Sequence, residues 1–89
     1  MSTVTIYTTP ACPYCTAAKA LLQSKGVAFN EISIEGDPAA ASALAARTGR
    51  RSVPQIFVGK THVGGCDDLH ALEQAGGLDP LLEQAVVNV

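Results

Sequence analysis

A short apolar strand that leads into Cys12-Pro13-Tyr14-Cys15 constrains the fold of this chain more than any other feature. Residues 4–8 read Val-Thr-Ile-Tyr-Thr, and β-branched and aromatic residues of this kind favour a short buried strand. From Pro13 onward, apolar residues recur at three- and four-residue spacing until Gly26, which predicts a helix over residues 13–25. The two thiols therefore lie where a strand ends and a helix begins.

Apolar patterns, capping residues and turn glycines indicate the remaining elements. A strand is expected within residues 27–34, although its register stays open, and a helix is expected from Asp37-Pro38 to Arg47, where Gly49 ends it. Two strands at 55–58 and 61–63 are joined by a turn at Gly59-Lys60. Helical stretches follow after Asp68 and from Asp79. A parallel strand–helix–strand unit followed by a hairpin and helices predicts an α/β fold. We expect one domain over residues 1–89, with a four-stranded mixed sheet flanked by helices on both faces.

Composition excludes several classes of function. The 89 residues carry six basic and eight acidic side chains, so the net charge of −2 offers no general attraction to nucleic acid or anionic membranes. The sequence shows neither a signal-peptide pattern nor an apolar stretch near the ~18 residues that a membrane-spanning helix needs. Three cysteines differ from the dense, even set of a secreted disulfide scaffold. We therefore expect a cytoplasmic protein with no nucleic-acid or membrane partner.

The Cys12 and Cys15 thiols are predicted to be inequivalent. Cys12 faces the free N–H groups and the positive dipole end of the helix, which favour its thiolate form. Cys15 is three residues further, inside the first turn, where its thiol is covered but within disulfide reach. This arrangement predicts that Cys12 attacks disulfides and Cys15 resolves the intermediate.

Two other interpretations of the cysteine pair stay open from the residues alone. The cysteines can be an incidental buried pair, or they can form half of a zinc site. A second half would need Cys66, His62 and His70, which lack paired ligand spacing, and both histidines are expected at the surface. We therefore expect no metal.

Two further segments join strands to their neighbours. Pro54 follows Ser52-Val53 and stands at the start of a strand, which is one of the positions where proline is tolerated in a sheet. Gly64-Gly65-Cys66-Asp67-Asp68 leads from a strand into a helix, where free N–H groups can bind a carboxylate or the acids can simply cap the helix. Cys66 alone is most often a small buried apolar residue.

Together, these segments resemble three signature regions of the glutaredoxin family. The matching residues are Tyr7 to Cys15, Ser52 to Phe57 and Gly64 to Leu69, in the family's order and across essentially the whole chain. The chain is most similar to the small bacterial dithiol glutaredoxins. That resemblance implies a thioredoxin-like fold and a glutathione-disulfide oxidoreductase that uses glutathione to reduce protein–glutathione mixed disulfides and protein disulfides. It also implies a monomer with protein substrates such as ribonucleotide reductase.

The resemblance also implies how glutathione binds. A cis peptide bond before Pro54 presents the backbone of Val53 to the cysteinyl part of glutathione, the free N–H groups at the start of the last motif hold the γ-glutamyl end, and Tyr14 flanks the sulfur. Where many members carry a lysine, this chain has Thr9, which leaves Arg51 and Gln55 as partners for the glycine carboxylate. The expected glutathione-binding residues are Tyr14, Arg51, Val53, Pro54, Gln55, Gly65, Cys66, Asp67 and Asp68.

Two alternatives to this function remain. A redoxin of the same fold can take its electrons from thioredoxin reductase, although such a protein does not need the Gly64–Asp68 motif. Some glutaredoxins instead bridge an iron–sulfur cluster between two subunits, but Pro13 resembles the members that do not readily do so.

Overall fold

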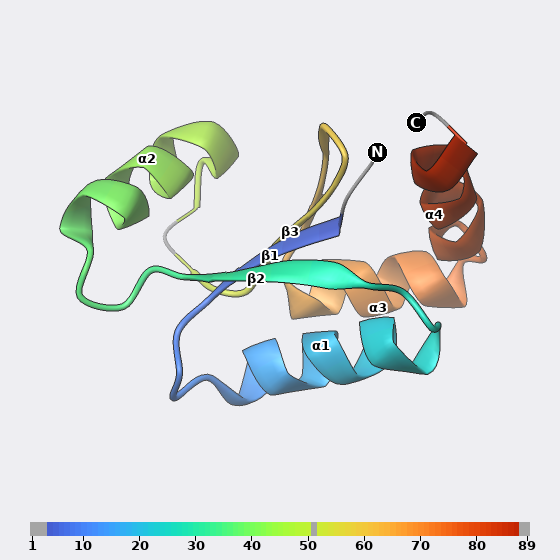
Figure 1. Cartoon of the computed structure of the whole chain (residues 1–89), viewed down its shortest axis with the longest axis horizontal. Helices are drawn as coiled ribbons and strands as arrows, with labels where there is room; N and C mark the ends of the chain where they lie inside the picture. Colours follow the sequence, from blue (N-terminus) through green and yellow to red (C-terminus); the bar gives the residue numbers. More distant parts are fainter. Residues whose placement is uncertain (1–3, 51, 88–89) are drawn as a thin grey trace.

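A mixed sheet with strand order β2-β1-β3-β4 forms the centre of the molecule (Figure 1). The structure, a computed structural model, describes residues 4–50 and 52–87, with side chains up to residue 82. The strands are β1 (Val4–Thr8), β2 (Phe29–Ser33), β3 (Gln55–Val58) and β4 (Thr61–Gly64). β1 pairs in parallel with β2 and antiparallel with β3, and β3 pairs antiparallel with β4. The predicted mixed sheet is confirmed.

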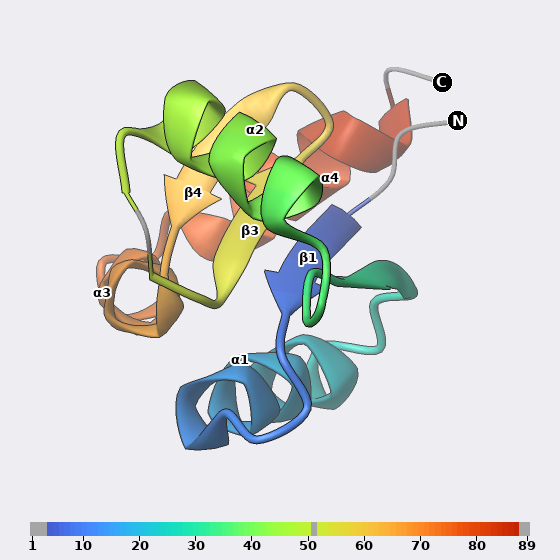
Figure 2. The same cartoon turned by 90° about the vertical axis from the view of Figure 1, so that its left-hand side faces the viewer.

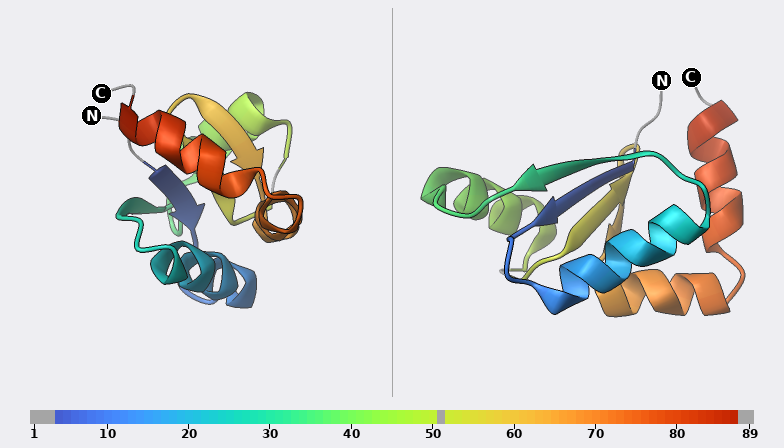
Figure 3. Two further views of the ribbon diagram at one scale, coloured as in Figure 1. Left: turned by 90° about the vertical axis from the view of Figure 1, so that its right-hand side faces the viewer. Right: turned by 60° about the horizontal axis from the view of Figure 1, so that its bottom comes forward.

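Four helices complete the described chain and cover both faces of the sheet. They are α1 (Pro13–Ser24), α2 (Pro38–Thr48), α3 (Cys66–Gln74) and α4 (Leu78–Val87). α1 and α3 lie side by side on one face, while α2 lies on the other (Figures 1 and 2). α4 follows α3 and rises beside the end of the sheet, as both views of Figure 3 show. No helix in this part of the chain is long and apolar enough to cross a membrane.

The ends of α2 follow the capping residues in the sequence. The Asp37 carboxylate accepts the Ala40 N–H at 3.0 Å, and Pro38 occupies the first turn, where a missing N–H costs nothing. Gly49 ends the helix in the left-handed region at φ 72°, which a side chain would disfavour. The helix predicted from these residues is therefore confirmed at both ends.

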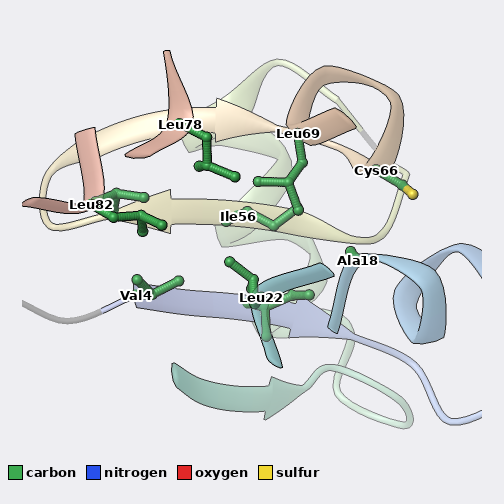
Figure 4. Packing of buried hydrophobic residues seen from close by; sticks show 10 residues of the cluster. Val4, Ala18, Leu22, Ile56, Cys66, Leu69, Leu78 and Leu82 are labelled. Carbon is green, nitrogen blue, oxygen red and sulfur yellow. The ribbon is translucent and has the colours of Figure 1, made fainter. Parts of the chain in front are cut away.

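The main hydrophobic core lies between the sheet and the helices α1 and α3 that cover one of its faces (Figure 4). Alternate residues of β1 and β3 point into it and meet apolar side chains from α1, α3 and α4. The buried members of this core are Val4, Ile6, Ala18, Leu22, Ile56, Val58, Cys66, Leu69, Leu78 and Leu82. Because α1 and α3 both pack here, the core fixes the two helix N-termini relative to one another.

Leu22→Ala is expected to lower the free energy of unfolding by about 2–5 kcal/mol, because Leu22 is 0% exposed and its truncation leaves a cavity under α1. Urea unfolding followed by circular dichroism measures the change. The neighbouring Gln23→Ala, on the exposed side of the same helix, should stay within about 0.5 kcal/mol of the parent protein. A loss below about 1 kcal/mol for Leu22→Ala would contradict this description of the core.

Candidate active site

Cys12 and Cys15 form a pair at the start of α1. Cys12 is the N-cap residue, and its sulfur accepts the Cys15 backbone N–H at 3.2 Å. A thiolate at this position is stabilised by that N–H and by the positive end of the helix dipole. The helix therefore offers a place for negative charge on the Cys12 sulfur.

The two thiols differ in their exposure. Cys12 is half-buried, whereas Cys15 is 1% exposed and belongs to the first turn of the helix. Burial, followed by the hydrogen bond with Cys12, raises the pKa of the Cys15 thiol to about 11. At neutral pH, Cys15 is therefore held as a thiol beneath the more accessible Cys12.

The segment before β3 lies against Cys12. The peptide bond between Val53 and Pro54 is cis, as the family resemblance implied. The Cys12 thiol donates a hydrogen bond to the Val53 carbonyl oxygen, with sulfur and oxygen 3.7 Å apart. Residues that are 41 positions apart in the chain thus meet at one reactive sulfur.

The N-terminus of α3 forms another part of the site. The Asp68 carboxylate accepts the Gly65 N–H at 2.9 Å and pairs with the Arg50 guanidinium at 2.6 Å. These two partners, Arg50 foremost, lower the pKa of the Asp68 carboxyl group. Because this carboxylate also packs against Gly64, whose φ is +118°, a side chain at Gly64 would collide with it. The first N–H groups of α3, those of Cys66 and Asp67, have no acceptor within the helix.

A pocket of about 200 Å³ lies between the Val53–Pro54 segment and the start of α3. Tyr14, which is 65% exposed, stands at its edge next to the cysteine pair. The lining residues are Tyr14, Arg50, Ser52, Val53, Pro54, Gly65, Cys66, Asp67 and Asp68. The pocket combines backbone polar groups, a cation and carboxylates, which suits a small peptide that carries both charges.

The pocket contains every residue that the sequence indicated for glutathione except Arg51 and Gln55. Arg51 lies outside the described residues. The Gln55 side chain is 0% exposed and bonds to other protein groups. The sequence interpretation missed Arg50 and Ser52, although the cluster of arginines before Ser52 was the signal that could have indicated a cation here.

The two histidines, which were expected at the surface, are both only partly exposed. His62 Nε2 lies 2.7 Å from the Gln55 amide oxygen, and His70 Nδ1 lies 3.4 Å from the Cys66 sulfur. Burial, followed by the nearby charge of Asp67, raises the pKa of the Cys66 thiol. Among the described residues, no group of three His, Cys, Asp or Glu side chains is arranged to hold a metal ion.

Comparison with known proteins gives one consistent family. The family model described as Glutaredoxin matches residues 4–63. The chain is 61% identical over 82 residues to a glutaredoxin of Pseudomonas aeruginosa, which covers 92% of this chain and 98% of that protein. It is 57% identical over 83 residues to glutaredoxin 3 of Escherichia coli K12, which covers 93% of this chain and 100% of that protein.

A solved structure agrees with the sequence relatives. The crystal structure of a buckwheat glutaredoxin–glutathione complex superimposes with a TM-score of 0.89 at 30% identity and covers 94% of this chain and 79% of that chain. The thioredoxin-like fold implied by the resemblance is therefore confirmed. The family match, the identity to bacterial relatives and the paired thiols at a helix N-terminus together show that this chain belongs to the glutaredoxin family of glutathione-dependent thiol–disulfide oxidoreductases.

Proposed function

We propose that Cys12 is the attacking thiol of this enzyme and Cys15 the resolving thiol. The inequivalence of the two thiols carries the proposal: Cys12 caps the helix, is half-buried and contacts the Val53 carbonyl oxygen, whereas Cys15 is buried and its pKa is raised to about 11. An exposed thiolate reacts with an incoming disulfide, and a covered thiol acts only on the intermediate beside it.

In deglutathionylation, the Cys12 thiolate attacks the glutathionyl sulfur of a protein–glutathione mixed disulfide. The bond between Cys12 and glutathione forms as the substrate's S–S bond breaks, and the substrate leaves as a thiolate that takes up a proton. The thiolate of a second glutathione then attacks the bound glutathionyl sulfur, which releases Cys12 and oxidised glutathione. This route uses Cys12 alone.

Reduction of a protein disulfide uses both cysteines. Cys12 forms a mixed disulfide with one substrate sulfur, and the other substrate sulfur leaves as a thiol. Cys15 then loses its proton and attacks the Cys12 sulfur, which releases the reduced substrate and leaves a Cys12–Cys15 disulfide. Two glutathione molecules restore the dithiol and become oxidised glutathione.

We propose that glutathione binds in the pocket beside Cys12. In this arrangement the Val53 backbone pairs with the cysteinyl part, and the free N–H groups of Cys66 and Asp67 bind the γ-glutamyl carboxylate; all three residues line the pocket. Asp67 and Asp68 supply negative charge for its ammonium group, and Tyr14 and Pro54 flank the sulfur. The buckwheat glutaredoxin, whose structure contains glutathione, supports the choice of ligand.

Many members of the family carry a lysine where this chain has Thr9. We propose that Arg50 takes over the role of that lysine and binds a glutathione carboxylate. Arg50 lines the pocket, and its guanidinium pairs with Asp68 where both side chains are open to solvent. Arg50→Ala is expected to raise the KM for glutathione about two- to fivefold, the usual range for one exposed charge pair. Arg51→Ala, measured beside it, reports whether the neighbouring arginine shares the task. An unchanged KM in Arg50→Ala would contradict the assignment.

Coupled turnover tests the proposed function as a whole. Reduction of a glutathionylated peptide by the parent protein should proceed with glutathione, glutathione reductase and NADPH. It should be at least about tenfold slower with thioredoxin reductase and NADPH, which do not use the glutathione pocket. Faster turnover with thioredoxin reductase would favour the redoxin alternative and contradict the proposal.

We also propose that the enzyme acts in the cytoplasm as a monomeric single domain and that ribonucleotide reductase is among its substrates. Three cysteines and no dense disulfide framework support a reducing compartment. The similarity to small bacterial glutaredoxins over almost their full length supports a single domain.

A further inference from the structure

The Gln55 side chain has all its polar groups engaged within the protein. It is 0% exposed on β3, where it shares a sheet face with its cross-strand partner Tyr7. Its amide nitrogen lies 3.0 Å from the Ser52 carbonyl oxygen and 3.4 Å from the Ser52 hydroxyl oxygen. Its amide oxygen lies 2.7 Å from His62 Nε2. A buried amide that is satisfied in this way is not available to a ligand.

Hydrogen-bond chemistry fixes the direction of this chain of contacts. The Ser52 carbonyl oxygen can only accept, so the Gln55 NH2 group must face it and donate. The Gln55 oxygen then faces His62 and can only accept, so His62 Nε2 must carry a proton and donate. His62 therefore holds the orientation of the Gln55 amide.

Aromatic contacts hold the His62 ring in place. The ring lies 4.9 Å from the Phe57 ring, centroid to centroid, with an angle of 31° between the planes. The Arg47 guanidinium lies 4.4 Å above the Phe57 ring and donates a hydrogen bond to the Tyr7 hydroxyl at 3.1 Å. The outer end of the chain of contacts is thus anchored to β4, β3 and α2.

The inner end of the chain reaches the wall of the glutathione pocket. Ser52, Val53 and Pro54 all line that pocket, and the Val53 carbonyl oxygen is also the contact of the Cys12 sulfur. Ser52 itself is exposed and begins this stretch, so the Gln55 amide is the side chain that ties its carbonyl group to the sheet. Movement at Ser52 would displace the Val53 backbone groups beside it.

We infer that Gln55 is a positioning residue for glutathione: held by His62, it fixes the Ser52–Pro54 wall of the pocket from behind and does not touch the ligand. The inference rests on the proposed function, because it takes that wall as part of the glutathione site. It replaces the sequence expectation that Gln55 contacts the glycine carboxylate directly. Its effect is on the binding of the glutathionyl group, since Cys12 keeps its place at the N-terminus of α1.

Kinetics of two single variants and their combination test this inference. Gln55→Met keeps roughly the same side-chain volume and removes all three side-chain hydrogen bonds, and it should raise the KM for a glutathionylated peptide about tenfold while kcat stays within about twofold. His62→Phe keeps an aromatic ring beside Phe57 but removes the outer bond, and it should raise that KM about threefold. Because His62 acts through Gln55, the double variant should be no worse than Gln55→Met.

Thr8→Val provides the matched control. Thr8 is 1% exposed, and its hydroxyl donates a hydrogen bond to the Glu31 carboxylate at 2.7 Å. Thr8 lies on β1 and Glu31 on β2, and neither strand lines the pocket. This variant loses a buried hydrogen bond of similar kind, so it should unfold at lower urea concentration without changing the KM. An equal rise in KM for Thr8→Val would show that general loss of stability explains the effect.

The outcomes separate the inference from the proposed function. If the parent protein shows no glutathione-dependent turnover, the proposed function fails. If the parent turns over normally and Gln55→Met keeps its KM within about twofold, only the positioning role fails. If the KM increases of the two single variants multiply in the double variant, the positioning role is also overturned, because His62 would then act independently of Gln55. If Gln55→Met does not fold, His62→Phe alone tests the role, because His62 is only half-buried. An unchanged KM in His62→Phe would then overturn it.

Discussion

Cys12→Ser is expected to abolish turnover of every disulfide substrate, whereas Cys15→Ser keeps deglutathionylation and loses reduction of protein disulfides. A serine hydroxyl is not ionised at neutral pH, so the loss for Cys12→Ser should be roughly a thousandfold or more. Cys15→Ser removes only the thiol that is 1% exposed, which the deglutathionylation route does not use. Its rate on a protein disulfide should fall about tenfold or more, because the mixed disulfide must then wait for glutathione.

Two substrates measured side by side make this test specific. A glutathionylated peptide reports the route through Cys12 alone, and a protein with one accessible disulfide reports the route through both thiols. Both are followed through NADPH oxidation with glutathione reductase. Equal losses in the two variants on both substrates would contradict the division of labour between the cysteines.

The step that uses Cys15 should accelerate steeply with pH. Burial is the main cause that raises the pKa of Cys15 to about 11, and burial persists when Cys12 is held in a mixed disulfide. Only the Cys15 thiolate attacks, so while burial keeps the pKa of Cys15 above the assay pH, the thiolate fraction, and with it the rate of resolution, rises about tenfold per pH unit. Between about pH 6.5 and 8.5 the expected increase is roughly a hundredfold.

Stopped-flow absorbance measures this step when Cys12 carries a thionitrobenzoate group. Attack by Cys15 on the Cys12 sulfur releases the coloured thiolate. Cys15→Ser is the control and should show no such release. A rate that is flat over this pH range would mean that ionisation of Cys15 does not limit resolution.

Much of the fold follows from local sequence signals. Asp37-Pro38 and Gly49 enclose α2 because a capping carboxylate, a first-turn proline and a left-handed glycine act within a few residues. Cys12-Pro13 marks the start of α1 for the same reason. The register of β2 was not predictable, because β2 is an edge strand with most of its residues exposed, including Ile32, which is 42% exposed. An exposed edge carries no clear alternation of apolar and polar residues.

The site was predictable where a motif places the residue and not where tertiary contacts do. Val53, Cys66 and Asp67 follow from the family's signature regions, and the structure brings them around one pocket. Arg50 was missed because its position in the pocket depends on the pairing with Asp68, 18 residues away. The contact between Gln55 and His62 likewise depends on how β3 and β4 pair, which individual residue types do not reveal.

The glutathione adduct in solution tests the proposed site most directly. Cys15→Ser, treated with oxidised glutathione, should carry one glutathione on Cys12 by peptide mass spectrometry. In nuclear magnetic resonance spectra of that adduct, the backbone amides of Val53, Cys66 and Asp67 should shift most and show contacts to glutathione protons. Glutathione attached to Cys66, or shifts confined to residues away from the Val53–Pro54 segment and the start of α3, would contradict the proposed site.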